Sequence, residues 1–128
     1  MWRSRGGLAL AAPAKSILPL DGDGSALIHM GALSTIGYGR PNNLIHVALN
    51  NEGYISTGGQ LSTSRTSSPD AVASACGYRA TALCKRSDHV IAVTQQCLRT
   101  RGPHFVVCKV NRQHSSPLPR VTSRYSPL

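Results

Sequence analysis

Two short polar segments of this chain combine carboxylate or amide side chains with glycine, each directly after an apolar run. The first, "LDGDGS", contains Asp21 and Asp23, and the second, "LNNEGY", contains Asn50 and Asn51. The chain has only 5 acidic residues against 14 Lys and Arg, so two neighbouring carboxylates need a local reason. Carboxylate, amide and carbonyl oxygens bind hard cations such as Mg²⁺, which commonly bridges carboxylate to phosphate. The two segments therefore predict a bound cation that carries an anionic group.

The first segment also suits the anion itself. Gly24 would let a phosphate approach the backbone, and a helix predicted to begin at Ser25 would offer free N–H groups and a positive dipole end. A carboxylate there would repel phosphates unless a cation lay between them, which makes Asp23 a candidate Mg²⁺ ligand. The Asn50–Asn51 pair and the backbone carbonyl of Gly53 could add further oxygens. The alternative is a pair of turns whose polar side chains only cap the backbone.

The elements expected around these segments alternate between strands and helices. We expect strands at residues 17–21, 44–49, 79–84 and 104–110, and helices beginning at Ser25, at Ser68–Pro69 and near Ser87. This alternation predicts the α/β class, a three-layer α/β/α arrangement with a mostly parallel sheet. Ligands of such sheets bind beyond the carboxyl ends of the strands. Both polar segments follow strands, so we expect them to face one crevice.

The pattern "GDG", then 25 residues, then "NN" resembles the diphosphate-binding motif of thiamine diphosphate enzymes. The resemblance implies thiamine diphosphate and Mg²⁺ as cofactors. It implies that Mg²⁺ is held by the side chains of Asp23 and Asn51 and by the carbonyl of Gly53. The residues that it places at the cofactor are Gly22, Asp23, Gly24, Ser25, Asn51, Gly53 and Tyr54.

A narrower resemblance covers about residues 7–125. The segments "LPLDGDGSALIHMGALSTIG", "NNEGYISTGGQLSTS" and "AVASACGYRATALC" are similar to the C-terminal, cofactor-binding portion of phosphonopyruvate and sulfopyruvate decarboxylases. The implied substrate is a small phosphonate or sulfonate keto acid. Consecutive hydroxyl and glycine N–H donors suit such an oxyanion, and a flexible linker is the alternative for the same segment. The predicted substrate residues are Ser56, Thr57, Gly58, Gly59 and Gln60.

The chain departs from that family at both ends. Family members begin this domain earlier, with a further strand, whereas "GGLALAAPAK" here is similar to the end of the domain's first helix. We therefore expect a partial domain at residues 7–110, with the first strand and helix largely missing. Residues 1–6 do not match, and residues 111–128 are expected to form an extended tail rich in Pro, Ser and Arg.

The resemblance also implies that catalysis needs a second polypeptide segment. In these enzymes the glutamate that activates the aminopyrimidine lies on a separate pyrimidine-binding domain, and Glu52, the only glutamate here, sits between the expected metal ligands. We expect no catalytic residue in this chain, an inactive isolated chain, and a pyrimidine-binding domain or subunit as partner in an oligomer. The alternatives are a truncated, non-catalytic remnant and a basic polyanion-binding protein whose affinity falls with salt.

The composition of the chain bears on nucleic-acid binding, on membrane insertion and on the state of the cysteines. The net charge of +9 is spread along the chain without a nucleic-acid motif, so no specific nucleic acid is expected. No apolar run approaches the roughly 20 residues of a membrane span, and the short apolar N-terminal stretch that could pass for a secretory signal breaks at Pro13. The four cysteines lack zinc-site spacing, and we expect buried free thiols in a cytoplasmic protein.

Overall fold

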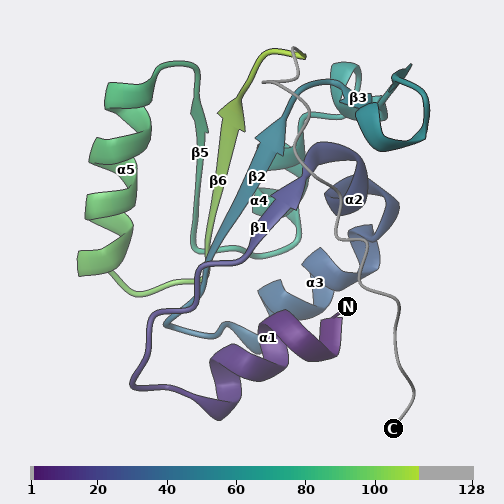
Figure 1. The fold of residues 1–128 in the computed structure, drawn as a ribbon. Coiled ribbons are helices and arrows are strands. Elements are labelled where there is room, and N and C mark those ends of the chain that lie inside the picture. The colour runs from purple at the N-terminus through teal and green to yellow at the C-terminus, as the bar shows by residue number, and fades with distance from the viewer. Residues whose placement is uncertain (1, 113–128) are drawn as a thin grey trace, which may run out of the picture.

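The computed structural model describes residues 2–112, which fold as a parallel sheet with helices on both faces (Figure 1). The helices are α1 (Trp2–Ala11), α2 (Asp23–Ile28), α3 (Met30–Gly39), α4 (Pro69–Ala75) and α5 (Ser87–Arg99), with short 3-10 helices η1 (Ile55–Thr57) and η2 (Thr63–Arg65). The strands are β1 (Leu20–Gly22), β2 (Ile45–Asn50), β3 (Gly53–Tyr54), β4 (Gln60–Leu61), β5 (Ala80–Cys84) and β6 (His104–Lys109). The predicted α/β class is confirmed.

The main sheet has four strands in the order β1-β2-β6-β5, and every neighbouring pair is parallel. The two central strands are matched residue for residue, from Ile45 opposite His104 to Asn50 opposite Lys109. Because all four strands run the same way, their carboxyl ends lie at one edge of the sheet. The turns that follow β1 and β2 therefore meet at that edge, beside α2 and β3 (Figure 1).

Alternation along the strands sends side chains to two separate cores. On the face covered by α1–α4, the core includes Leu33, Ile36, Ala48, Phe105 and Val107. On the opposite face, under α5, it consists of Ile45, Val47, Cys84, Cys97, Val106 and Cys108. The sheet is thus the middle of three layers, as the sequence predicts.

The turn after β1 differs from the sequence prediction. The helix begins at Asp23, with Gly22 in an extended conformation (φ −91°, ψ 154°) as its N-cap, so Ser25 lies inside the first turn rather than at the cap. The helical stretch also breaks at His29 (φ −108°, ψ 41°), which separates α2 from α3. The predicted strand at residues 17–21 shortens to β1, and Ile17 joins Leu44 only through an isolated bridge.

The other predicted elements shift less. Helix α4 begins at Pro69 after Ser68, as predicted, whereas α5 already includes Ser87 and has Arg86 at its N-cap position. The polar stretch after β2 contains the antiparallel pair β3–β4, in which Gly53 lies opposite Leu61, and the sequence pattern does not reveal this pair because it is only two residues long on each side.

Two sequence expectations concern the ends of the chain. Helix α1 runs across the predicted boundary between residues 6 and 7, and the tail expected at 111–128 lies, beyond Arg112, outside the described residues. Between residues 2 and 112, no helix combines the length and the hydropathy required to cross a membrane.

Candidate functional site

A crevice of about 510 Å³ opens at the carboxyl ends of β1 and β2. All seven residues predicted to contact the cofactor line it: Gly22, Asp23, Gly24, Ser25, Asn51, Gly53 and Tyr54. The volume lies in the range of small-molecule sites, roughly 300–1,000 Å³. The structure therefore brings the two polar segments together in the place where α/β sheets bind ligands.

Asp23 is the buried charge of this crevice. Its side chain is 1% exposed, and its Oδ2 accepts hydrogen bonds from the hydroxyls of Ser62 and of Ser64, the latter at 2.8 Å. Neither hydroxyl bonds Oδ1. In the described part of the chain, no Lys, Arg or His forms an ion pair with Asp23. Burying a carboxylate without a counter-charge is costly, so the site fits a bound cation.

Asn50 and Asn51 lie in different parts of the site: Asn50 is buried beneath the crevice, and Asn51 lines it. Asn50, 1% exposed, accepts a hydrogen bond at Oδ1 from the Glu52 backbone N–H at 3.0 Å. The Ser64 hydroxyl also lies 3.0 Å from this oxygen, and its one proton is shared between Asn50 Oδ1 and Asp23 Oδ2. Asn51 Oδ1 accepts from the Gly53 backbone N–H at 3.0 Å and lines the crevice. Among residues 2–112 no three His, Cys, Asp or Glu side chains form a metal-binding group. A cation here would therefore combine one carboxylate with amide and carbonyl oxygens, the donors that Mg²⁺ prefers.

Gly24 packs against the ring of Tyr54. A Cβ at this position would stand less than 3.0 Å from three atoms of the Tyr54 ring. The missing side chain thus makes room for Tyr54, whereas at Gly22 a Cβ would meet nothing within 4 Å. The Tyr54 ring therefore lies against Gly24 where a Cβ would stand, and the corresponding side of Gly22 is open.

Basic side chains surround the turn at Glu52. Glu52 adopts a left-handed backbone conformation (φ 60°). Its carboxylate pairs with Lys109 Nζ at 2.5 Å. The hydrogen bond and the charge of Lys109 hold the pKa of the Glu52 carboxyl below its ordinary value. Arg112 donates from Nη2 to the Glu52 carbonyl at 2.6 Å and from Nε to the Asn51 carbonyl at 3.1 Å. Lys109 and Arg112 therefore hold the turn that presents Asn51 and Gly53.

The segment predicted to bind substrate begins at the crevice and leaves it. Ser56 lines the crevice, whereas Thr57, Gly58, Gly59 and Gln60 are exposed and are not among its lining residues. Gly58 and Gly59 have positive φ (117° and 79°), and Thr57 Oγ1 donates to Gln60 Oε1 at 3.3 Å. Glycine is needed here for the turn, and the segment forms an exposed rim beside the crevice.

Three side chains, those of Asp21, His46 and Tyr78, form a row of polar contacts that leads from the crevice into the protein. Asp21 Oδ1 accepts from the Gly22 backbone N–H at 3.0 Å, and Asp21 Oδ2 lies 3.5 Å from His46 Nε2. His46 Nδ1 lies 3.2 Å from the Tyr78 hydroxyl, and the His46 ring packs edge-on against Phe105. The two acids of "LDGDGS" thus have different neighbours. Asp21 faces His46 on β2, whereas Asp23 faces Ser62 and Ser64.

Sequence reasoning offered Asn50 only as one of two possible cation ligands, and it missed His46, Ser62 and Ser64. The two serines follow the predicted substrate segment as "STS", and both are buried, Ser62 as the N-cap of η2 and Ser64 within η2. Two buried hydroxyls spaced two apart in a polar loop are the signal that could have indicated an inward-facing turn.

A parallel sheet that brings a buried "GDG" carboxylate and an "NN" turn to one crevice defines the class of thiamine diphosphate-binding domains. Residues 5–108 match the family model described as the thiamine pyrophosphate enzyme, C-terminal TPP binding domain. The chain belongs to this family.

Named relatives agree with the narrower resemblance. The chain is 42% identical over 100 residues to a phosphonopyruvate decarboxylase of Streptomyces viridochromogenes, covering 78% of this chain and 25% of that protein. It is 33% identical over 115 residues to sulfopyruvate decarboxylase subunit beta of Methanococcus maripaludis, covering 90% and 60%. A solved structure from Mycobacterium smegmatis, described as that of a thiamin diphosphate-dependent enzyme, superimposes with a TM-score of 0.71 at 26% identity, covering 84% of this chain and 21% of that one. The chain thus spans a quarter of the length of the streptomycete relative.

Proposed function

We propose that this chain is the thiamine diphosphate- and Mg²⁺-binding portion of a phosphonopyruvate or sulfopyruvate decarboxylase. The observation that carries the proposal is the Asp23 carboxylate, buried without a cationic partner among the described residues, in the crevice that all the predicted cofactor contacts line. Family membership supports thiamine diphosphate as the ligand.

Each residue has a defined part in this proposal. Asp23 supplies the negative charge for Mg²⁺, and Asn51 and the Gly53 carbonyl supply neutral oxygens. Ser62 and Ser64 hold the Asp23 carboxylate in place through Oδ2. When bound, thiamine diphosphate would supply a nucleophilic carbon and an electron sink for the loss of CO₂. The chain's own part is to bind and orient the diphosphate end.

The substrate and the partner follow from the relatives. The names of the relatives specify phosphonopyruvate and sulfopyruvate, and the exposed rim of Ser56–Gln60 offers hydroxyl and backbone donors for a phosphonate or sulfonate group. One relative is named as a beta subunit, which supports a partner that supplies the pyrimidine-binding domain. Reaction in the proposed assembly therefore needs both polypeptides.

The test is calorimetric titration of thiamine diphosphate into the chain with and without Mg²⁺. We expect binding that requires Mg²⁺, is abolished by Asp23→Ala and is weakened less by Asn51→Ala, since water can replace a neutral donor. Asp88→Ala is the matched control, because Asp88 is an exposed acid on α5 that pairs with Arg86.

Asp23→Asn separates charge from folding. It keeps an oxygen that can accept from Ser62 and Ser64, so a folded but non-binding Asp23→Asn chain assigns the loss to the missing charge. Parent binding that is equally tight without Mg²⁺, or unchanged in both Asp23 variants, would show that the crevice does not hold a metal-bridged diphosphate.

A further inference from the structure

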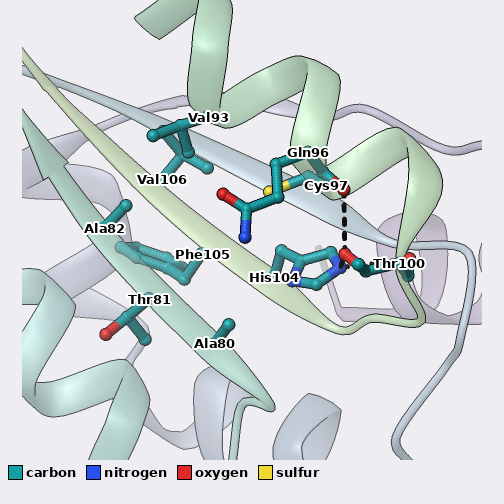
Figure 2. Close-up of a pocket in the computed structure, with 10 residues that line it drawn as sticks. All are labelled: Ala80, Thr81, Ala82, Val93, Gln96, Cys97, Thr100, His104, Phe105 and Val106. Atoms are coloured by element: carbon teal, nitrogen blue, oxygen red, sulfur yellow. Dashed lines mark hydrogen bonds between the residues drawn. The ribbon is translucent and has the colours of Figure 1, made fainter. Parts of the chain in front are cut away.

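A second, smaller cavity lies between α5 and the strands β5 and β6 (Figure 2). Its volume is about 160 Å³. Ala80 and His104, the first residues of β5 and β6, line it together with Thr100, which follows α5. It is therefore at the amino ends of the strands, whereas the cofactor crevice is at their carboxyl ends. An inference about this cavity does not depend on the proposed function.

The walls of the cavity are largely apolar. Val93 and Cys97 approach from α5, and Ala82 and Val106 from the sheet (Figure 2). None of the described residues that line it is a Lys, Arg, Asp or Glu. An apolar cavity of about 150 Å³ in another protein stays dry and binds benzene. This cavity therefore has room for one small ring, and its walls disfavour a charged one.

The hydrogen bonds of Thr100 fix the tautomer of His104. Thr100 Oγ1 donates to the Gln96 carbonyl at 2.9 Å, so the single hydroxyl proton is already used. His104 Nε2 lies 3.2 Å from that hydroxyl oxygen and 3.3 Å from the Thr100 carbonyl oxygen. Both oxygens can only accept, so Nε2 carries the proton. In a neutral imidazole the other nitrogen, Nδ1, is then an acceptor.

That acceptor is unused. His104 is 4% exposed, and within the described residues its Nδ1 is buried without a hydrogen-bond partner. Buried polar atoms nearly always have a partner. The same imidazole lines the cavity, and Figure 2 shows the Gln96 side chain reaching from α5 toward the strands beside it. A mostly apolar space of one-ring size thus has the vacant, buried imidazole acceptor of His104 in its wall, with Thr81 and Gln96 as further polar lining residues.

We propose that this cavity is a binding site for a small, uncharged, mostly apolar molecule with one O–H or N–H donor, of the phenol type. The donor hydrogen-bonds to His104 Nδ1, and the ring lies between Val93 and Cys97 on α5 and Ala82 and Val106 on the sheet. The ligand is selected by shape and by that one hydrogen bond.

The test compares phenol with toluene, which has a similar shape and no donor, by NMR titration of the whole 128-residue chain. We expect phenol to shift the amide signals of Val93, Cys97 and His104, and to bind about fivefold more tightly than toluene, the effect of one net hydrogen bond. His104→Phe should remove this preference. His89→Phe, at an exposed histidine on α5, should keep it, and Cys97→Met should weaken both ligands by filling the cavity.

Three results would overturn the proposal. Equal affinity for phenol and toluene would show that His104 accepts no hydrogen bond from the ligand. If the amide signals of Val93, Cys97 and His104 do not shift up to the solubility limit of phenol, the cavity is not a binding site. Tighter binding of benzoate than of phenol would show that a charged ligand is preferred. If His104→Phe does not fold, the imidazole ¹⁵N signal of His104 in the parent protein decides, because phenol should shift the Nδ1 resonance and toluene should not.

Discussion

The ring of Tyr54 occupies the space that a side chain at residue 24 would need, so that Gly24 and Tyr54 form one contact across the crevice, between α2 and β3. This contact joins the two polar segments independently of any ligand. It makes glycine at residue 24 a packing requirement.

Gly24→Ala should therefore destabilise the protein. The added methyl group forces the Tyr54 ring to move, and overpacking of this kind typically costs about 1–3 kcal/mol. Gly22→Ala is the control, since its backbone is extended and a Cβ there meets nothing within 4 Å. Urea unfolding of both variants gives the comparison. Equal unfolding free energies would show that Tyr54 is not packed against Gly24.

Ser64→Ala should lower stability by removing a buried hydroxyl. The single proton of that hydroxyl faces two acceptors, Asp23 Oδ2 (2.8 Å) and Asn50 Oδ1 (3.0 Å), and the loss of a buried hydrogen bond to a charged group costs about 1.5–3 kcal/mol. Thr63→Ala, at an exposed position in the same 3-10 helix, should change the unfolding free energy by less than about 0.5 kcal/mol. Thermal unfolding of the two variants measures the difference, and a Ser64→Ala chain as stable as Thr63→Ala would contradict the network.

The buried thiols should make the protein less stable in alkali. Burial raises the pKa of Cys84, Cys97 and Cys108 above the ordinary 9.0. The unfolded chain then loses these protons first, so the stabilisation is complete below pH 9 and is lost as the pH rises above it. Urea unfolding should be measured from about pH 7 to about pH 10.5, on both sides of the ordinary thiol pKa. The free energy of unfolding should fall more steeply with pH for the parent than for Cys97→Ala. Parallel curves would contradict the prediction.

Thiol labelling of the native protein should be selective. Cys76 is partly exposed, whereas the other three cysteines are buried, and a buried thiol with a raised pKa provides little reactive thiolate. We expect a maleimide reagent to modify Cys76 first and the others only after unfolding, as mass spectrometry of the labelled peptides would show. Rapid modification of Cys97 would indicate that α5 opens.

The isolated chain should not decarboxylate phosphonopyruvate or sulfopyruvate. Losing a positioned general acid or base typically costs about 10² to 10⁴ in rate, and Glu52 cannot supply it because its carboxylate is paired with Lys109. CO₂ release with saturating thiamine diphosphate and Mg²⁺ is the assay. Adding a pyrimidine-binding subunit should restore turnover. Turnover near one per second from this chain alone would require a catalytic acid within it.

The main sheet could be predicted because its strands are apolar runs separated by helical patterns. All four strands were located within a few residues, and the position of "GDG" and "NN" at strand ends was enough to bring Asp23 and Asn51 to one crevice. This part of the site depends only on strand direction, which the alternation of strands and helices along the chain predicts.

The contacts that complete the site could not be predicted in the same way. Ser62 and Ser64 reach back to Asp23 over 39 and 41 residues, and no local pattern encodes that distance. The helix was expected at Ser25 because serine is a good N-cap, but the chain turns directly from the extended Gly22 into α2. The Gly24–Tyr54 contact likewise exists only after the sheet has formed.

The position of β6 has a consequence for the synthesis of the protein. This strand is the last one in the described chain, yet it lies between β2 and β5, and β5 has no other neighbour in the sheet. A growing chain that has not yet reached His104 cannot join β5 to the rest of the sheet, so the backbone edges of β2 and β5 that pair with β6 stay open until residue 109 has left the ribosome. Chaperones that bind exposed strands should therefore associate with the nascent chain over most of its translation, and should release it when β6 enters the sheet.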